Sequence, residues 1–516
     1  MGKNKKSPMI CIIIDGWGLG KNEEGNSIRL ADTSVFDSLM KEYPMTTLHA
    51  SGKYVGLPPQ QVGNSEAGHM NIGAGRLVEQ DAVKISKSIN EGTFFKNAAF
   101  IEAIHHAQKN NSKLHIMGML SNGMSAHSDP DHILALLVLA RKYKVKNVYL
   151  HIFTDGRDSP KYSAYKMIKR MEGLLQEGEQ ISTIIGRYYA MDRKKKWERT
   201  DLSYDALVMN KGRLVKTAEE AIDDSYHRGE SDEFIKPYLI GKSEKSRIND
   251  GDSVIFFNLR SDRARQLTKA FLQKDFNKMN PGSIKRPKLL HNFLFVAMTD
   301  FGPDLGRVLT AFPSVDLTNT LPMVLKNMSQ AYVAEKEKYA HVTYFFNGGY
   351  SGIVDSEDQL VIPSPDVKSY DETPGMSSEA LTDLILKNLE KDKYDFTLLN
   401  YAAPDMVGHT GNLQAGIECC SIVDKCIGKI IKAYLKKKGT VIITADHGNV
   451  EKMIELKTGE IYTEHTFNKV PFIVVNDELK KKIKLKSSGV LGDIAPTILK
   501  LLDQDKPEEM TGKALY

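Results

Sequence analysis

The chain has 516 residues, which is too long for one ordinary hydrophobic core and therefore predicts two or three domains. Its 70 basic and 65 acidic residues give a formal charge of +5, which is near balance and excludes a general attraction to nucleic acid or membranes. The four cysteines lack disulfide or CxxC spacing and no apolar run has the length of a signal-peptide core or a membrane span, so we expect a cytoplasmic protein.

Short apolar runs that end in polar residues or glycine predict strands that are buried on both faces. In chain order these runs cover residues 9–16, 113–123, 147–156, 253–260, 394–401 and 440–448. Helical patterns such as 132–143 and 379–391 lie between them. This alternation is typical of an α/β chain with mostly parallel sheets, in which ligands bind beyond the carboxyl ends of the strands. The polar side chains expected there are Asp15, Asp158, Arg260, Asp405, Asp446 and His447.

Two segments of the C-terminal half combine carboxylates with imidazoles. The segment TADHGN delivers Asp446 and His447 together onto a glycine turn at the end of a predicted strand. The segment PDMVGHTG places Asp405 and His409 four residues apart, which one helical turn would bring onto the same side. Both segments therefore offer pairs of metal ligands.

Further ligands of the same two kinds come from His465, in TEHTFNKVP, and from Asp15, at the end of the first predicted strand. Carboxylates mixed with imidazoles suit manganese, zinc, cobalt or iron better than calcium, which prefers oxygen alone. A single histidine is more often an ordinary core or surface residue. Several such sets at strand ends nevertheless predict a site for two metal ions.

Ser65 lies in the segment VGNSEAGHMNIGAGR, after a flexible Gly-Asn pair and before a segment able to begin a helix. Backbone N–H groups at a helix N-terminus can hold a phosphate, and a bound metal ion can hold the serine oxygen as an alkoxide. Ser65 is therefore a candidate nucleophile. The structural alternative is that Ser65 only caps a helix, with Glu66 in the first turn. The GxSxG pattern of acyl-transfer hydrolases is absent.

A third group of candidates carries positive charge near predicted strand ends. Its arginines are Arg157, Arg187, Arg193, Arg260 and Arg263. Guanidinium groups match carboxylate and phosphate oxygens two at a time, so such a cluster suits a small, multiply charged acid such as phosphoglycerate. Asp158 and His127 are suited to act on its hydroxyls as base or hydrogen-bond partner, and Lys338 is a further cation for a phosphoryl group.

Taken in order, these motifs closely resemble those of the cofactor-independent (2,3-bisphosphoglycerate-independent) phosphoglycerate mutases, a family of the alkaline phosphatase superfamily. The resemblance runs from DGWG at 15–18 to HTFNKVP at 465–471 and covers nearly the whole chain. The implied metal ligands are Asp405, His409 and His465 for one ion, and Asp15, Ser65, Asp446 and His447 for the other. The implied substrate-binding residues are His127, Arg157, Asp158, Arg187, Arg193, Arg260, Arg263 and Lys338.

The resemblance also implies a reaction: the interconversion of 3-phosphoglycerate and 2-phosphoglycerate in glycolysis and gluconeogenesis, without 2,3-bisphosphoglycerate. Ser65 would carry the phosphoryl group, and Lys338 and Asp158 would also be catalytic. Two divalent ions are implied, with Mn²⁺ expected and Co²⁺, Zn²⁺ or Mg²⁺ as alternatives.

The implied organisation is a monomer with an alkaline-phosphatase-like, metal-binding domain split between 1–79 and 313–516. A phosphotransferase domain that binds the substrate, 80–312, would be inserted between the two parts. The only implied partner is the small-molecule substrate, with neither nucleic acid nor membrane.

One segment departs from the family pattern. Where such mutases tend to read GGVHSHxDH, this chain reads GMSAHSDPDH at 123–132. The spacing is longer by one residue and the second histidine is replaced by Asp129, but His127 still aligns. The departure predicts a changed shape for this part of the substrate pocket.

Three other functions fit parts of the sequence. A phosphatase or a phosphopentomutase of the same superfamily would need the same metal ligands, although the arginine motifs favour glycerate. A dinucleotide-binding turn at 16–20 would lack the third glycine of GxGxxG, because residue 21 is lysine, and Asp15 would face the pyrophosphate with the wrong charge. A non-catalytic binding module would be expected to have lost Ser65, a metal ligand or Lys338, and all of these are present.

Overall fold

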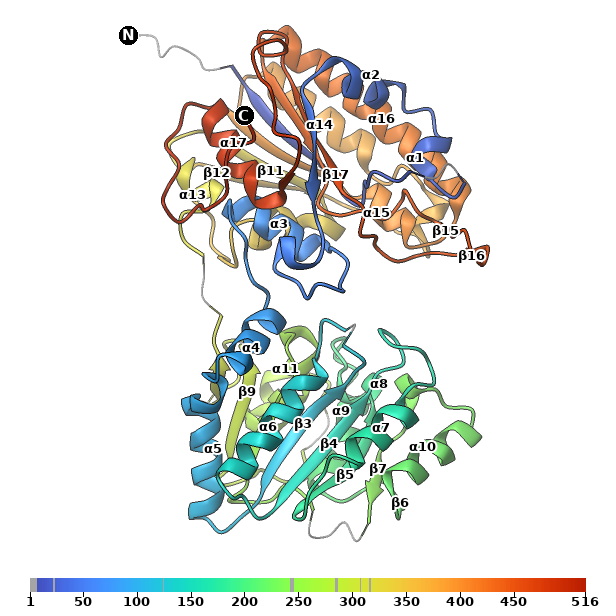
Figure 1. The fold of residues 1–516 in the computed structure, drawn as a ribbon, viewed down its shortest axis with the longest axis vertical. Helices are drawn as coiled ribbons and strands as arrows, with labels where there is room; N and C mark the ends of the chain where they lie inside the picture. The colour runs from blue at the N-terminus through green and yellow to red at the C-terminus, as the bar shows by residue number, and fades with distance from the viewer. Residues whose placement is uncertain are drawn as a thin grey trace. The chain divides into compact units, whose positions relative to one another are not determined.

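The computed structural model describes residues 7–21, 24–123, 125–241, 246–283, 286–306, 308–314 and 317–516. Met124, in the segment that departs from the family pattern, lies outside these described residues. The chain forms two compact units (Figure 1). Unit 1 comprises Met1–Gln80 and Val315–Tyr516, and unit 2 comprises Asp81–Ser314, so unit 2 is one continuous segment.

Unit 1 is built on an eight-stranded sheet with the strand order β12-β11-β13-β1-β14-β17-β2-β18. The strands are β1 (Met9–Ile14), β2 (Met45–His49), β11 (Gln330–Glu335), β12 (Glu357–Ile362), β13 (Phe396–Tyr401), β14 (Thr440–Thr444), β17 (Val470–Val475) and β18 (Gly489–Val490). The five strands from β12 to β14 run parallel, and β17 is antiparallel to both of its neighbours. A separate two-stranded hairpin joins β15 (Ile454–Glu455) to β16 (Glu460–Ile461).

The centre of this sheet determines where the polar strand ends lie. β1 is buried along its whole length between β13 and β14, and each fully buried isoleucine stabilises the fold by about 1.5–3 kcal/mol. In the register of these strands, Ile13 pairs with Asn400 on one side and with Thr444 on the other. The carboxyl ends of all three strands are therefore level, and the residues that follow them emerge at one edge of the sheet.

Helices cover the sheet of unit 1. They are α1 (Ser27–Leu30), α2 (Ser34–Glu42), α3 (Ser65–Ala74), α13 (Leu321–Val324), α14 (Ser378–Glu390), α15 (Ala403–Gly408), α16 (Leu413–Lys436) and α17 (Ile494–Leu501). The long helix α16 packs against both α14 and α2 (Figure 1). Its cysteines Cys419, Cys420 and Cys426 are buried and free.

Unit 2 contains a second eight-stranded sheet, with the order β10-β9-β8-β3-β4-β5-β7-β6. Its strands are β3 (Leu114–Leu120), β4 (Val148–Thr154), β5 (Glu179–Gly186), β6 (Arg213–Val215), β7 (Tyr238–Ile240), β8 (Ser253–Phe256), β9 (Leu294–Thr299) and β10 (Leu309–Phe312). All neighbours are parallel except β5 and β7. Separate apolar clusters, around Ile133 and around Phe271, pack helices against it.

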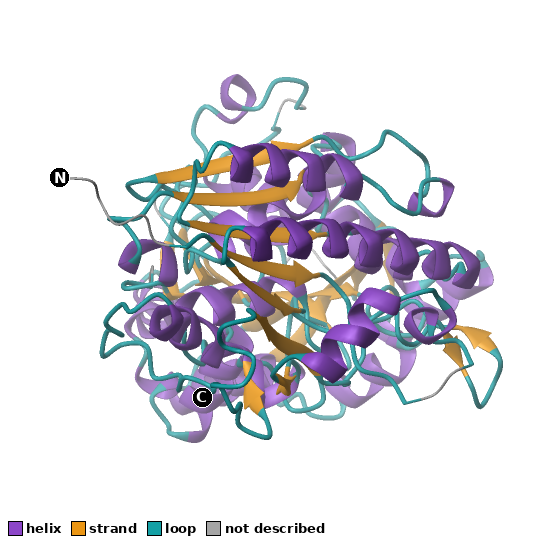
Figure 2. Cartoon of the chain, turned by 90° about the horizontal axis from the view of Figure 1, so that it is seen from above, coloured by secondary structure: helices purple, strands orange, loops and turns teal. Residues whose placement is uncertain are grey.

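The helices of unit 2 are α4 (Asp81–Asn90), α5 (Ala98–Lys109), α6 (Pro130–Lys142), α7 (Ala164–Glu172), α8 (Arg187–Ala190), α9 (Trp197–Val208), α10 (Ala218–His227), α11 (Ser261–Leu272) and α12 (Phe276–Met279). Helices run alongside the strands throughout the chain (Figure 2). The prediction of an α/β chain with mostly parallel sheets is confirmed, and each of the six predicted runs contains a strand. Within the described residues, no helix combines the length and the apolar character that a bilayer span requires.

Candidate active site

The edge of the unit 1 sheet brings together carboxylates from three adjacent strands. Asp15 follows β1, Asp446 follows β14, and Asp405 lies in α15, which begins just after β13. All three side chains are buried. The N–H of Asp15 also donates to the carbonyl of Tyr401 at 3.1 Å, which fixes the end of β1 against the end of β13. Parallel strands in level register therefore produce this concentration of negative charge.

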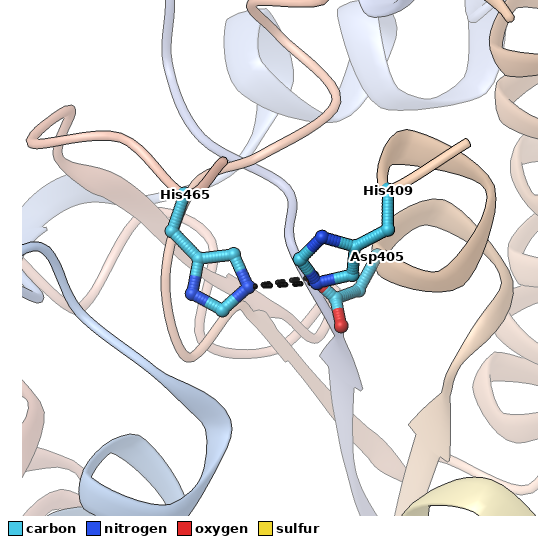
Figure 3. A group of neighbouring side chains, drawn as sticks. All are labelled: Asp405, His409 and His465. Carbon is cyan, nitrogen blue, oxygen red and sulfur yellow. Dashed lines mark hydrogen bonds and ion pairs between the residues drawn. The ribbon is translucent and has the colours of Figure 1, made fainter. Parts of the chain in front are cut away.

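One group of possible metal ligands consists of Asp405, His409 and His465 (Figure 3). The Nε2 atoms of His409 and His465 lie 3.1 Å apart, and they are 3.4 and 3.2 Å from Asp405 Oδ1. The Nδ1 atoms point the other way, to the carbonyls of Thr463 and Gly63, each at 2.8 Å. An Nδ1–H that donates to a carbonyl leaves Nε2 without a proton and ready to bind a metal ion.

A second group surrounds Ser65. The Ser65 hydroxyl oxygen lies 3.1 Å from Asp15 Oδ1, 3.0 Å from His447 Nε2 and 2.7 Å from Lys338 Nζ. Asp446 Oδ2 lies 3.5 Å from the same His447 nitrogen. The His447 ring also stacks on His465 with 3.8 Å between the centroids, so the two groups adjoin.

Lys338 lies among the carboxylates of unit 1. It follows β11 in a single tight turn, and its ammonium is 2.8 Å from Asp15 Oδ1 and 2.6 Å from Asp405 Oδ2. Burial lowers the pKa of Lys338, but the attraction of Asp15 and Asp405 is stronger and raises it overall. Burial and the neighbouring Asp446 raise the pKa of Asp15 to about 6. One ammonium therefore faces three buried carboxylates, and negative charge remains in excess.

This donor set fits divalent metal ions. Carboxylate oxygens and imidazole Nε2 atoms converge within the reach of single ions, in groups that include Asp405, His409 and His465 and also Asp15, Asp405 and His447. Buried carboxylates in excess of the available cations are costly unless positive charge is supplied. The predicted ligands of unit 1 are therefore brought together by the fold.

The position of Ser65 decides between the two interpretations of its segment. Asn64 is the N-cap of α3, and its side chain accepts a hydrogen bond from the N–H of Ala67 at 2.9 Å. Ser65 is the first helical residue, and its hydroxyl faces Lys338 and His447. The interpretation of Ser65 as a helix cap is wrong, because its neighbour has that role.

Sequence reasoning missed two polar residues that support this group. His69 Nδ1 lies 2.9 Å from the carbonyl of Ser65 and 3.3 Å from Asp446 Oδ2, and its Nε2 lies 3.0 Å from the amide of Asn400. That amide donates to Asp15 Oδ2 at 2.8 Å. The spacing of His69, one helical turn after Ser65, was a signal that could have identified it. Asn400 lies inside an apolar run and gave no signal.

In unit 2, Arg187 is buried and binds two carboxylates. Its Nη1 lies 2.5 Å from Asp155 Oδ1 and 2.8 Å from Asp158 Oδ2, and the hydroxyl of Ser125 donates to the same Asp158 oxygen at 2.6 Å. Burial raises the pKa of Asp158, but Arg187 and Ser125 outweigh it, so the pKa is lowered. Asp155, which also lies at the end of β4, was missed by the sequence reasoning.

The other predicted cations of unit 2 gather around Asp262, which was also missed. Arg193 Nη1 lies 2.5 Å from Asp262 Oδ2, and Arg260 Nε lies 3.2 Å from Asp262 Oδ1. Burial, with repulsion from Arg193, Arg187 and Arg157, lowers the pKa of Arg263 to about 10. The guanidinium groups therefore lie close enough to influence one another, beside the carboxylates that pair with them.

His127 lies close to two of these arginines, Arg187 and Arg260. Burial and the charges of Arg187 and Arg260 lower its pKa to about 3, so the imidazole is neutral at pH 7. Its carbonyl accepts a hydrogen bond from the N–H of Leu259 at 2.8 Å. This bond holds segment 123–132, which differs from the family pattern, against the end of β8. Asp129 caps α6 and accepts from the N–H of Asp131 at 2.8 Å. Arg157 is the most exposed of the group and lies 3.6 Å from Glu233.

The protein-family model of the Metalloenzyme superfamily matches residues 7–506 of the sequence. The fold and its converging carboxylates and imidazoles are therefore those of a class of metal-dependent enzymes. Within that class, the chain belongs to the family of 2,3-bisphosphoglycerate-independent phosphoglycerate mutases. The resemblance found in the motifs is thereby confirmed.

Relatives of that name support this membership over the full length. The proteins from Clostridium kluyveri and Clostridium acetobutylicum are each 48% identical to this chain, and the protein from Clostridium tetani is 47% identical. Each match covers 99% of both sequences. The crystal structure of Leishmania mexicana phosphoglycerate mutase is similar with a TM-score of 0.78 and 28% identity, over 99% of this chain and 98% of that one.

Proposed function

We propose that this enzyme interconverts 3-phosphoglycerate and 2-phosphoglycerate without 2,3-bisphosphoglycerate and that Ser65 carries the phosphoryl group in between. The relatives named above support the reaction. The observation that carries the role of Ser65 is the position of its hydroxyl, which lies within 3.1 Å of Asp15, His447 and Lys338 at the start of a helix. Such surroundings favour loss of the hydroxyl proton and attraction of a phosphoryl group.

Two divalent ions are part of the proposal, and Mn²⁺ is the first choice, with Co²⁺, Zn²⁺ and Mg²⁺ suited to the same donors. The proposed ligands are Asp405, His409 and His465 for one ion, and Asp15, Ser65, Asp446 and His447 for the other. When bound, such ions lower the pKa of a serine hydroxyl and neutralise phosphoryl oxygens.

In the first half of the reaction, Ser65 Oγ forms a bond to phosphorus while the bond from phosphorus to the C3 oxygen of glycerate breaks. The proton that the Ser65 hydroxyl loses passes to that C3 oxygen, and the ammonium of Lys338 stabilises charge on the transferring group. In the second half, ionised Asp158 takes the proton of the C2 hydroxyl while that oxygen takes the phosphoryl group from Ser65, and the proton then returns to Ser65 Oγ, which restores the enzyme.

The glycerate must remain bound between the two halves, because otherwise water would hydrolyse the phosphoserine. We assign its retention to unit 2, as a proposal that the positive charge of this unit supports. The residues proposed to bind the substrate there are His127, Arg157, Asp158, Arg187, Arg193, Arg260 and Arg263. Neutral His127 is suited to a hydrogen bond with a hydroxyl, and the guanidinium groups to the carboxylate.

The corresponding assignment of domains gives metal binding and phosphoryl transfer to 1–79 with 313–516, and substrate binding to 80–312. A monomer in the cytoplasm is the proposed working form, in keeping with a substrate of central carbon metabolism.

The decisive experiment follows 3-phosphoglycerate by ³¹P NMR with purified, metal-stripped protein and no added 2,3-bisphosphoglycerate. We expect no turnover without metal, and formation of 2-phosphoglycerate after addition of Mn²⁺ or Co²⁺. Turnover in the presence of excess chelator would contradict the metal mechanism. A strict need for 2,3-bisphosphoglycerate would contradict the phosphoserine mechanism.

A further inference from the structure

Glu451 is a buried carboxylate next to the proposed metal ligands that the mechanism does not use. Its side chain is 3% exposed. One carboxylate oxygen, Oε2, accepts from the N–H of Gly18 at 3.1 Å and from the N–H of Asn449 at 2.8 Å. The other, Oε1, accepts from the hydroxyl of Thr466 and from the amide of Asn468 at 2.9 Å. All four donors are uncharged, so the carboxylate is stabilised by hydrogen bonds.

These donors belong to three different loops, and each loop carries a proposed metal ligand. Gly18 lies three residues after Asp15, Asn449 lies two residues after His447, and Thr466 directly follows His465. Glu451 is therefore the point at which the loops after β1 and β14 meet the loop that precedes β17. None of the groups of possible metal ligands within the described residues includes Glu451.

The packing around the carboxylate leaves little room for another arrangement. A Cβ atom added to Gly18 would lie 2.2 Å from Glu451 Oε1, and one added to Gly448 would lie 2.3 Å from the same atom. Both glycines therefore allow the backbone of a ligand-bearing loop to approach Glu451 closely. The N–H of Thr466 also donates to the carbonyl of Gly448 at 2.9 Å, which joins two of the loops directly.

The connection extends to the remaining ligand segment through Asn449. Its N–H donates to Glu451, and its side-chain amide donates to Asp405 Oδ1 at 2.9 Å. The same N–H lies 2.9 Å from the carbonyl of Gly16, directly after Asp15. Asp405 is the carboxylate on which His409 and His465 converge. A change at Glu451 would therefore reach ligands of both proposed ions.

We propose that Glu451 is a positioning residue that sets the affinity of the site for divalent ions by holding these loops in register. The inference rests on the proposed metal site. It assigns to Glu451 no contact with substrate or with a metal ion. Residues that orient metal ligands from outside the coordination sphere typically change metal affinity or activity 10–100-fold when they are replaced.

The test compares Glu451→Gln with Asp424→Asn. The Glu451→Gln substitution keeps the shape of the side chain but replaces one acceptor oxygen by an NH₂ group that would face donors. Asp424 is a matched control, because it is also buried in unit 1 and its carboxylate accepts from the N–H groups of Val35 at 3.0 Å and Phe36 at 2.8 Å. These contacts fix α2, which carries none of the proposed ligands.

The measurements are the Mn²⁺ affinity of each metal-stripped protein, by competition with a chelator, and its unfolding in urea. We expect the dissociation constant for Mn²⁺ to rise about 10–100-fold in Glu451→Gln and to stay within about two-fold in Asp424→Asn, although both proteins lose stability. Turnover of Glu451→Gln should approach the wild-type rate at saturating Mn²⁺. If Glu451→Gln does not fold, Asn468→Ala, which removes one donor, should raise the dissociation constant in the same direction by a smaller factor.

Unchanged Mn²⁺ affinity in folded Glu451→Gln would overturn the role of Glu451. An equal loss of Mn²⁺ affinity in Asp424→Asn would also overturn it, because it would indicate a general effect of lower stability. A wild-type protein that binds no Mn²⁺ would instead overturn the proposed metal site. The two failures are therefore distinguishable.

Discussion

Replacing Lys338 by methionine removes an ammonium that contacts both Asp15 and Asp405. These contacts are 2.8 and 2.6 Å long and are buried. Removal of one partner from a buried ion pair typically costs about 3–5 kcal/mol, because the other charge is left without compensation. We expect a loss of this size in the free energy of unfolding of metal-free unit 1 at pH 7.

Bound metal should reduce that loss. Divalent ions on the same carboxylates supply the charge that Lys338 provides in their absence, so the remaining cost is that of a hydrogen bond to a charged group, about 1.5–3 kcal/mol. A smaller loss of unfolding free energy with metal than without it would indicate that Lys338 and the metal ions interact with the same carboxylates. Mutase turnover of the metal-loaded variant should also fall strongly, since the transferring group loses its cation.

The assay is urea unfolding followed by tryptophan fluorescence. The chain has two tryptophans, Trp17 buried in unit 1 and Trp197 in unit 2, so a Trp197→Phe background reports on unit 1 alone. Lys480→Met is the control, because Lys480 forms a surface pair with Glu42 at 3.0 Å, and such pairs contribute about 0–1 kcal/mol. Equal losses for Lys338→Met with and without Mn²⁺ would refute the reasoning.

Ser65→Ala should abolish mutase activity but leave most of the metal bound. Intact-mass measurement after incubation with substrate should find a phosphoryl adduct in the wild type alone. Substantial turnover by the variant would exclude the phosphoserine mechanism. Arg193→Ala should lower turnover and raise the ratio of free glycerate to 2-phosphoglycerate about ten-fold or more, measured by NMR, since a charge-assisted contact of about 1.5–3 kcal/mol is lost. Arg213→Ala is a surface control and should change neither quantity. An unchanged ratio in Arg193→Ala would contradict its role in the retention of glycerate. Burial lowers the pKa of His132 to about 4, below the value of 6.5 in the unfolded chain. Between these two pH values the unfolded state binds more protons than the folded state. The free energy of unfolding should therefore decrease as the pH falls from about 6.5 to 4. The loss should be about 3 kcal/mol, measured by Trp197 fluorescence in a Trp17→Phe background, and a pH slope that His132→Gln does not flatten would contradict this cause.

Several of the proposed metal ligands could be expected from the sequence to lie together, because their places in the fold follow from chain geometry. Asp15 and Asp446 end continuous apolar runs, and the ends of parallel strands in level register lie at one edge of a sheet. Asp405 and His409 are four residues apart, which α15 converts into neighbours at 3.4 Å. These relations depend on local periodicity, which a single sequence contains.

Residues that act through long-range contacts could not be predicted in this way. Glu451 receives its hydrogen bonds from three loops, and only the folded chain shows that these loops meet. Asn400 lies in an apolar run that predicted only a buried strand. Asp155 and Asp262 lie close in sequence to Arg157 and Arg263, but only the arginines were interpreted as binding residues. The antiparallel directions of β17 and β7 also escaped prediction, because apolar periodicity contains no information on strand direction.

The central place of β1 also affects how the protein is made. Its two neighbours, β13 and β14, lie in the C-terminal part of the chain, whereas unit 2 is one continuous segment between them and β1. At synthesis rates of about 5–20 residues per second, the ribosome needs tens of seconds to reach β13 after it has made β1. During that time unit 2 can fold, while the isoleucines of β1 have neither neighbouring strand and expose apolar surface of the kind that favours aggregation.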